Sequence, residues 1–518
     1  MATRTLLPIH EAQTRMRTLT RFRNMLVHPR ALGVALGVAL GAAVLASCTS
    51  DVPTALQAKG AAFSLAPAFG KVDVCHKAGG HAGILEVGLE GLADHLAHGD
   101  YISTLLVSHE SGQPTDAAHF VTISDALASA VASRAAAGET VAATCRITIL
   151  VSAGTYQGTL GAASATLEHF PMIVDVPDIT LHGALVMALD AQGRATGVSA
   201  SGEESVLTPV VPLPFVNQIS TPIIIANGHP GGTAGNGLVV EGFVFQSGNR
   251  PILGPAGGQA ILSMRVTGLA IRDNRVEGGF TESIDLRASS ADVVQNHLSG
   301  TAGTCDMCLA GPGTFTANGN RLLAGGIVGI VVSPTNSLTV PPGVEPYALP
   351  TTADAWVDIR NNEVRDHLRT PVGVGIRMDA VGRGAPNVHG AIHAVVQDNL
   401  LVNNYFGMMA HGAFPVANTD SRGDVDMTLG GNVFQGSCQT NLYVALARHL
   451  LGLGQPNAIP TPLPAQNSTF RLTLNGDVNW SDAWFYHPAG FNNTLVVDGT
   501  DIANGTRQFF DPVGCPAN

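Results

Sequence analysis

The chain has few charged residues, few aromatic residues and little helical periodicity. Of its 518 residues, 13% are charged and 5% are aromatic, whereas 60 are Gly. High Gly content with low charge favours many short strands joined by tight turns. The sequence contains no phosphate-binding Gly loop, no nucleophile elbow and no nucleic-acid-binding motif. The composition therefore predicts an all-β chain.

The first 47 residues have the features of an export signal. Several Arg residues precede an uncharged stretch, Ala31 to Ser47, that is rich in Ala, Leu, Val and Gly. A basic start, a short apolar core and small residues before a cleavage site are typical of secretory signals. The ending Leu45-Ala46-Ser47-Cys48 resembles the lipobox of bacterial lipoproteins. That resemblance implies cleavage before Cys48, lipidation of Cys48 and anchoring in a bacterial cell envelope, at the outer membrane or cell surface. An ordinary signal peptide and a short membrane anchor remain alternatives.

The chain that follows this signal is acidic. Residues 1–47 contain six Arg and one Glu, so the remainder has 21 basic and 38 acidic residues and a net charge of −17. This balance disfavours nucleic acid as a partner, because bulk electrostatics would repel a polyanion. Residues 48–70 are expected to be a tether between the lipid and the folded protein.

A degenerate repeat dominates the second half of the chain. Each copy has an Asn, an apolar residue two places later, and a short alternating run 8 to 13 residues after the Asn. Repeats of short strands and polar turns predict a β-solenoid, and Asn at a turn tolerates left-handed geometry. We therefore expect the recurrent Asn residues to stack into a structural ladder. They are Asn274, Asn296, Asn320, Asn362, Asn399 and Asn432.

A helix is predicted before the first repeats, with Ser124 as its N-cap and Gly138 as its C-terminal cap. The strand ITILV and then Gly154-Thr155-Tyr156 follow it. This order resembles the opening of pectin-lyase-like right-handed parallel β-helices, in which a helix caps the first coil. The resemblance covers residues 119–480 and implies that fold there, with residues 481–518 as the second cap.

Alternation along the repeated runs predicts two columns of outward side chains on stacked strands. One column is Asp285, Cys308, Val331, Arg377, Met409 and Tyr443, and the other is Arg287, Ala310, Ser333, Asp379, His411 and Ala445. Ile376 and Met378 are expected to point inward.

In pectin-lyase-like proteins this kind of strand face commonly holds a saccharide groove. Arg377, Asp379 and His411 are therefore candidate catalytic residues. The candidate substrate-binding residues on this face are Asp285, Arg287 and Tyr443. The interpretation requires His411 to be exposed.

The resemblance suggests a protein that binds polysaccharide. The chain lacks the Asn-Thr-Asp, Gly-Asp-Asp, Gly-His-Gly and Arg-Ile-Lys set of polygalacturonases, and it shows no clear pectate-lyase calcium cluster. A polysaccharide lyase or glycoside hydrolase is therefore an alternative, and so is a structural or adhesive surface protein without catalysis.

A small Cys/His module is expected over residues 71–101. Its thiol, imidazole and carboxylate groups could bind Zn²⁺ or another divalent metal. The candidate ligands are Cys75, His76, His95, His98 and Asp100. The alternative is a disulfide-stapled surface module with incidental His residues. Elsewhere, Cys305 and Cys308 form a C-x-x-C on a predicted strand, for which a local disulfide or two free thiols is expected.

Overall fold

The computed structural model describes sixteen stretches of the chain, all of them within Gly60–Asn518. They are residues 71–77, 83–109, 117–139, 143–160, 166–210, 215–216, 219–220, 222–228, 236–247, 258–334, 352–368, 373–380, 389–412, 423–446, 467–487 and 492–508. The predicted signal, Cys48 and the tether lie outside these stretches.

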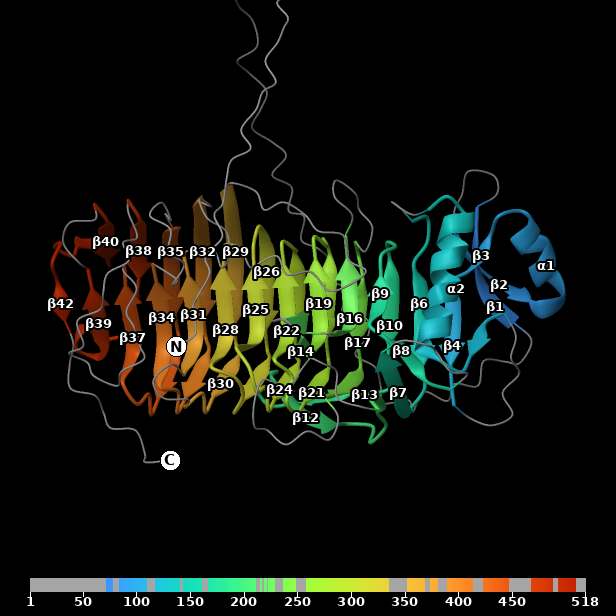
Figure 1. The fold of residues 1–518 in the computed structure, drawn as a ribbon, viewed down its shortest axis with the longest axis horizontal. Coiled ribbons are helices and arrows are strands. Elements are labelled where there is room, and N and C mark those ends of the chain that lie inside the picture. Colours follow the sequence, from blue (N-terminus) through green and yellow to red (C-terminus); the bar gives the residue numbers. More distant parts are fainter. Residues whose placement is uncertain are drawn as a thin grey trace, which may run out of the picture. The chain divides into compact units, whose positions relative to one another are not determined.

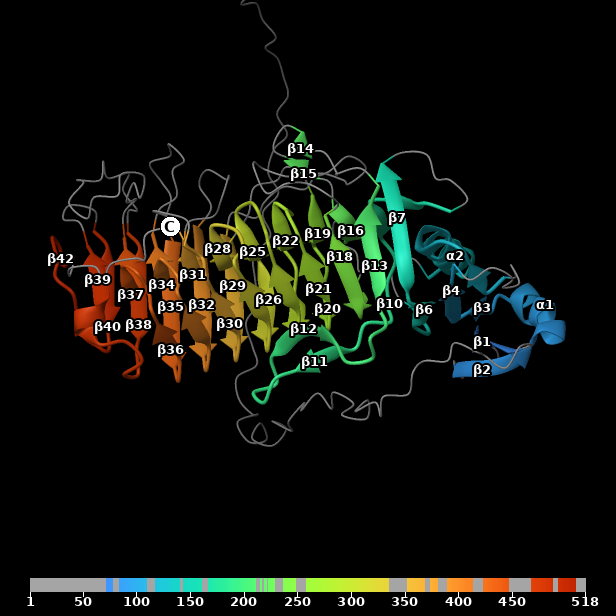
Figure 2. The same cartoon turned by 90° about the horizontal axis from the view of Figure 1, so that it is seen from below.

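The described chain winds through three long sheets, and most coils contribute one strand to each sheet. Nearly all strands in these sheets pair in parallel with the strand of the next coil, as Figures 1 and 2 show. This arrangement is a right-handed parallel β-helix, and the predicted fold class is confirmed. Within the described residues, no helix combines the length and the apolar character that a membrane span requires.

Sheet 1 contains the repeated runs that the sequence analysis identified. Its strands are β9 (Met172–Val174), β16 (Pro222–Asn227), β19 (Gln259–Met264), β22 (Glu282–Arg287), β25 (Cys305–Ala310), β28 (Val328–Ser333), β31 (Val374–Asp379), β34 (Phe406–His411), β37 (Thr440–Ala445), β39 (Ala483–Tyr486) and β42 (Arg507–Gln508).

Sheet 2 contains the strands that come before the Asn turns along the chain. Its strands are β5 (His119–Phe120), β4 (Thr104–Val107), β6 (Ile147–Val151), β10 (Ile179–His182), β17 (Val239–Glu241), β20 (Leu269–Arg272), β23 (Ala291–Val294), β26 (Gly313–Asn318), β29 (Thr352–Arg360), β32 (His389–Gln397), β35 (Gly423–Gly430), β38 (Thr469–Thr473), β40 (Thr494–Val497) and β41 (Thr500–Asp501).

Sheet 3 follows the Asn turns. Its strands are β8 (Glu168–Phe170), β7 (Gly154–Leu160), β13 (Ser205–Pro209), β18 (Phe243–Gln246), β21 (Arg275–Glu277), β24 (His297–Ser299), β27 (Arg321–Leu323), β30 (Glu363–Arg365), β33 (Leu400–Val402) and β36 (Val433–Gln435). Two short antiparallel pairs stand apart, β11 (Met187–Leu189) with β12 (Ala195–Ser199) and β14 (Phe215–Val216) with β15 (Ile219–Ser220).

The predicted Asn ladder is present between sheets 2 and 3. The backbone N–H and the side-chain amide of each Asn donate to the Oδ1 of the Asn one coil further on. Asn296, for example, donates both bonds to Asn320, at 2.9 and 3.0 Å. The ladder runs through all six predicted residues and ends on the carboxylate of Asp477. Because the ladder satisfies buried polar groups of successive turns, it fixes one coil upon the next.

The predicted helix is α2 (Ile123–Ala136), and it packs beside β4 and β6 at one end of the stack (Figure 1). Its N-cap is Thr122, whose side chain accepts a hydrogen bond from the N–H of Asp125. The predicted N-cap, Ser124, instead donates its hydroxyl to Glu168. Gly138 has a φ of +72° and follows the last helical turn, as a C-terminal Gly should.

The N-terminal module contains an antiparallel sheet and a second helix, which the sequence analysis did not predict. Strand β1 (Lys71–His76) pairs with β2 (Gly83–Gly88) on one side and with β3 (Tyr101–Ile102) on the other. Helix α1 (Leu89–Ala97) connects β2 to the segment before β3. A single 3-10 turn, η3 (Trp480–Asp482), lies near the other end of the described chain.

Candidate functional site

The predicted register of sheet 1 is confirmed. Arg377 pairs with Met409 and Asp379 pairs with His411, on adjacent strands β31 and β34. Met409 in turn pairs with Tyr443 on β37. Ile376 and Met378 belong to the central core, whereas Met409 and Tyr443 belong to a separate apolar cluster on the outer side of the sheet. The inward and outward faces were therefore assigned correctly.

The predicted exposure of this face is wrong. His411 is only 8% exposed, Asp379 is 2% exposed and Tyr443 is 1% exposed. The outer cluster also contains aromatic rings from neighbouring coils: Phe406 stacks on Tyr443, and the ring of Tyr443 meets Trp484 edge-on. These residues therefore do not line an open, solvated groove; they are buried among the apolar side chains on the outer face of sheet 1.

Two clusters of polar side chains nevertheless lie on this buried outer face of sheet 1. In the first, Nη2 of Arg377 donates to Oδ2 of Asp379 at 2.6 Å, directly beside His411 in the register. A guanidinium, a carboxylate and an imidazole at this spacing could perform acid–base chemistry if a substrate reached them.

The second polar group surrounds Asp285 and Arg287 on β22. Oδ2 of Asp285 accepts hydrogen bonds from the Arg287 guanidinium at 2.5 Å and from Nε2 of Gln259 at 2.7 Å. The same Gln259 nitrogen donates to Glu282 at 2.7 Å. Burial raises the pKa of Glu282 to about 7, and the neighbouring charge of Asp285 adds to the effect. Asp285 and Arg287 were predicted to contact substrate. In the structure Asp285 is fully buried, and its carboxylate bonds to Arg287.

An exposed aromatic platform lies on the outer face of sheet 2. Trp356 on β29 is 53% exposed, and its ring stacks on the imidazole of His393 on β32 with 3.8 Å between ring centroids. The neighbours of Trp356 in its own strand, Ala355 and Val357, point into the core. Trp356 therefore stands outward because of strand alternation, and a solvent-facing Trp is available for contact with a ligand.

Polar residues continue the column of outward side chains beyond His393, on the side away from Trp356. Strand pairing places Asp426 next to His393, and Arg471 next to Asp426. Both residues are exposed, and neither makes an ion pair within the described part of the chain. Asp354, two residues before Trp356 on the same face, is exposed as well. We call Trp356, His393, Asp354, Asp426 and Arg471 the Trp356 platform.

The predicted ligands of the N-terminal module separate into two groups. Cys75 forms a disulfide with Cys145, so its sulfur is not a thiolate ligand. His98, the residue that follows α1, is exposed and lies outside the cluster. Three of the five predicted ligands remain together, namely His76, His95 and Asp100. Asp100 Oδ2 lies 2.7 Å from Nδ1 of His76 and 2.9 Å from Nδ1 of His95.

The electrostatics of Asp100 reflect these contacts. Burial by itself would raise the pKa of Asp100, but the hydrogen bonds from His76 and His95 outweigh burial and lower that pKa to about 2. The backbone N–H of Lys77 donates to the other oxygen, Oδ1, at 3.0 Å. Asp100 is therefore an ionised and fixed acceptor for both imidazoles.

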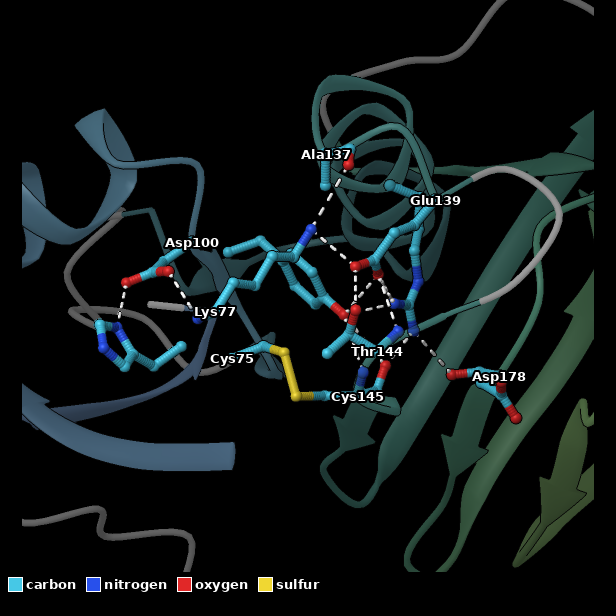
Figure 3. Close-up of a disulfide and its surroundings, with 11 residues drawn as sticks. Cys75, Lys77, Asp100, Ala137, Glu139, Thr144, Cys145 and Asp178 are labelled. Carbon is cyan, nitrogen blue, oxygen red and sulfur yellow. Dashed lines mark hydrogen bonds and ion pairs between the residues drawn. A yellow bond between two sulfur atoms is a disulfide. The ribbon is translucent and has the colours of Figure 1, made fainter. Parts of the chain in front are cut away.

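The disulfide and a buried ionic network join this module to the cap helix (Figure 3). Lys77 Nζ lies 2.6 Å from Glu139 Oε1, and Arg134 at the end of α2 donates to Glu139 Oε2 at 2.8 Å. Burial alone would raise the pKa of Glu139, but bonds from Lys77 and Thr144 lower it to about 2. The module is thus held on the solenoid by covalent and charged contacts.

A second possible set of metal ligands, Glu282, Cys305 and Cys308, lies on sheet 1 away from the module. Cys305 and Cys308 form a disulfide, which matches one of the two predicted states of this C-x-x-C. Oxidised sulfurs do not bind metal as thiolates do, so this group is not a metal site in the oxidised protein.

Comparisons with known proteins give neither a family nor a curated relative. No protein-family model matches the chain, and no curated protein matches it. Among solved structures, the chain is similar to a pectin methylesterase from Aspergillus niger, with 14% identity over 65% of this chain and 86% of that chain and a TM-score of 0.37. A rhamnogalacturonan lyase has 13% identity over 74% and 86%, with a TM-score of 0.37.

The catalytic unit of a GH87 alpha-1,3-glucanase from Streptomyces thermodiastaticus has 14% identity over 79% and 72%, with a TM-score of 0.32. Such distant similarities carry no argument about activity. The fold is established by the parallel strand pairing of this chain.

The Trp356 platform was not predicted, although the sequence contains a signal for it. In TADAWVDIR, small and apolar residues alternate with Asp354, Trp356, Asp358 and Arg360. That alternation places a Trp outward between two carboxylates. The predicted columns contained only the runs that follow each Asn turn, whereas β29 precedes one.

Proposed function

We propose that this chain is an exported, lipid-anchored surface protein that binds polysaccharide through the outer face of sheet 2. The observation that carries the proposal is the exposed indole of Trp356, which is held by the stacked ring of His393. The C–H bonds on one face of a pyranose ring pack well against an aromatic ring, and an aromatic face attracts such positively polarised edges. Carboxylates beside the ring can accept hydrogen bonds from sugar hydroxyls.

The charges around the platform favour a neutral or amino-sugar polymer. Asp354 and Asp426 are exposed carboxylates, and Arg471 is the basic residue of the platform. The mature chain as a whole carries an excess of acidic residues. A polyuronate would be repelled by this surface, whereas a neutral chain would not be and a protonated amino sugar would be attracted.

The test is a binding measurement with residues 48–518 and matched polysaccharides, with Trp356→Ala as the variant. Loss of the aromatic contact should weaken binding on the order of tenfold. Trp480→Ala is the control, because Trp480 is also exposed but lies outside the platform. Equal losses in both variants, or unchanged affinity in Trp356→Ala, would exclude the platform as the binding surface. Absence of binding to any glycan would leave the structural or adhesive alternative.

An alternative activity is polysaccharide cleavage by Arg377, Asp379 and His411, with Asp285, Arg287 and Tyr443 contacting substrate. It is supported by the Arg377–Asp379 ion pair beside His411. It requires sheet 1 to become accessible, because His411 is only 8% exposed. Release of reducing or unsaturated sugar ends by the purified chain, abolished in His411→Ala, would support this alternative over simple binding.

The proposal also includes a divalent metal, such as Zn²⁺, in the N-terminal module. Its support is the convergence of His76, His95 and Asp100. Imidazole and carboxylate are ordinary ligands of Zn²⁺ and of neighbouring transition metals.

A further inference from the structure

The end of helix α1 brings His95 and Asp100 together. Gly99 has a φ of +87°, its N–H donates to the C=O of Leu96 at 3.1 Å, and the N–H of Asp100 donates to the C=O of His95 at 3.2 Å. These two bonds and the left-handed Gly define a Schellman motif. The motif reverses the chain after α1, so that Asp100 returns to the helical turn that carries His95.

His76 reaches the same point from a different element. It is the last residue of β1, next to the Cys75–Cys145 disulfide, and its Nδ1 lies 2.7 Å from Asp100 Oδ2. Nδ1 of His95 lies 2.9 Å from the same oxygen. The Lys77 N–H holds Oδ1 of Asp100 on the opposite side, which directs Oδ2 toward the two imidazoles.

We propose that His76 Nδ1, His95 Nδ1 and Asp100 Oδ2 form an open metal centre that accepts a further oxygen or nitrogen ligand from solution. The inference rests on the proposed metal in the N-terminal module and goes further, because it assigns three ligands and an accessible coordination position. It also separates this centre from a structural zinc site, in which four protein ligands close the coordination sphere.

The distances permit this assignment with a small adjustment. Ligand atoms around a tetrahedral Zn²⁺ or Co²⁺ at about 2.0–2.1 Å lie roughly 3.3 Å apart. The present separations from Asp100 Oδ2 are 2.7 and 2.9 Å, so each imidazole must move by about half an ångström. Both His side chains are 27% exposed, whereas Asp100 is 1% exposed. The partly exposed rings have room to shift around the fixed carboxylate.

Within the described residues, two observations explain why no fourth protein ligand closes the centre. Cys75, which could have been a fourth ligand, is held in the disulfide. His98 is exposed and lies outside the cluster, because the Schellman turn returns Asp100, rather than His98, to the helix. Since the disulfide already ties the module to the solenoid, the metal is not needed as a staple. Two imidazoles and one carboxylate suit Zn²⁺, Co²⁺ or Ni²⁺ better than Ca²⁺ or Mg²⁺.

The experiment is a titration of metal-free residues 48–518, without an affinity tag, with Co²⁺, followed by visible absorption. We expect one Co²⁺ per chain and a spectrum that changes when acetohydroxamate is added, because the added ligand occupies the open position. His95→Ala and Asp100→Asn should each weaken Co²⁺ binding by more than about tenfold, since loss of even an outer-shell partner costs roughly 10–100-fold. His98→Ala is the matched control and should bind Co²⁺ as the parent chain does.

The outcomes distinguish metal binding in the module from the open coordination position. Failure of the parent chain to bind Co²⁺ near one equivalent would overturn both the metal and the open centre. A closed structural site would bind Co²⁺ tightly, would give a spectrum that acetohydroxamate does not change, and would raise the melting temperature strongly. That result would support the proposed metal but contradict the open coordination position. Equal losses in His98→Ala and His95→Ala would overturn the ligand assignment. Circular dichroism on each variant verifies that the solenoid is folded.

Discussion

The indole ring of Trp356 and the imidazole ring of His393 lie nearly parallel on adjacent coils, with 16° between their planes. Strand pairing sets them side by side, because Trp356 on β29 is in register with His393 on β32. The His ring stacks on one face of the indole, with 3.8 Å between ring centroids. This packing should limit the rotamers that the indole can adopt. A rigid aromatic surface loses less entropy when a ligand binds than a mobile one does.

Removal of the His393 ring should therefore weaken glycan binding even though Trp356 remains. We expect His393→Ala to lower affinity between about twofold and tenfold, the range of a lost aromatic contact. Trp356 should also become more accessible to a collisional quencher such as acrylamide. Gln397→Ala, on the same strand and face, is the control. Unchanged quenching and affinity in His393→Ala would mean that the stacking does not organise the platform.

Core and outward positions of the solenoid should respond differently to truncation. Ile376 is 1% exposed and lies in the central core, so Ile376→Ala should lower the free energy of unfolding by roughly 2–5 kcal/mol. Asp426→Ala, at an exposed outward position, should change it by less than about 0.5 kcal/mol. Urea denaturation of both variants measures the contrast. A similar cost at the two positions would contradict the assignment of faces.

The Asn ladder should be sensitive at each rung. Asn320 Oδ1 accepts two bonds from Asn296, and its side-chain amide donates to Asn362 and to the backbone of Val293. Asn320→Ala leaves buried donors without partners, each of which costs about 1–3 kcal/mol. Asn318→Ala, two residues earlier and exposed, should have little effect. Equal unfolding midpoints for these two variants would show that the ladder adds no stability.

Local pattern was sufficient for the repeat, its register and its turns. The spacing of Asn274 to Asn432 predicted the ladder, and alternation in the run around Ile376 predicted which side chains face the core. These features depend on two repeats: side chains alternate every two residues along a strand, and the Asn turn recurs once in each coil. Both periods are visible in a single sequence.

Features that depend on contacts between distant segments could not be derived in the same way. Alternation places His411 on the outer side of sheet 1, but it does not reveal that the side chains on that side are buried. The pairing of Cys75 with Cys145 links positions 70 residues apart. Asp477 ends the ladder as a carboxylate in place of an Asn, so a search for Asn alone could not find it.

The proposed lipid attachment would depend on Cys48, which lies outside the described residues. Because no other Cys follows a lipobox-like segment, Cys48→Ala should abolish lipidation and leave an uncleaved or unanchored product. Metabolic labelling with a lipid precursor measures the modification, and fractionation of cells measures the anchoring. Labelling that persists in Cys48→Ala would reject this cysteine as the attachment site.

The buried carboxyl groups of Glu282 and Asp285 on sheet 1 should make the free energy of unfolding depend on pH. Burial, with the charge of Asp285, raises the pKa of Glu282 from 4.5 to about 7 in the folded chain. Between these values the unfolded chain has lost a proton that the folded chain keeps, so the free energy of unfolding falls as pH rises. Above about pH 7 both states are ionised and the contribution becomes constant.

Glu282→Gln removes this titration while keeping a side chain of the same shape. The variant should therefore gain stability relative to the parent chain as pH rises from 5 to 8, by on the order of 2 kcal/mol. Asp273, whose pKa burial raises to about 6, titrates in both proteins and cancels in the comparison. Urea denaturation at pH 5, 6, 7 and 8 gives the difference directly. A difference between parent and variant that stays constant over this range would mean that Glu282 is already ionised in the folded protein.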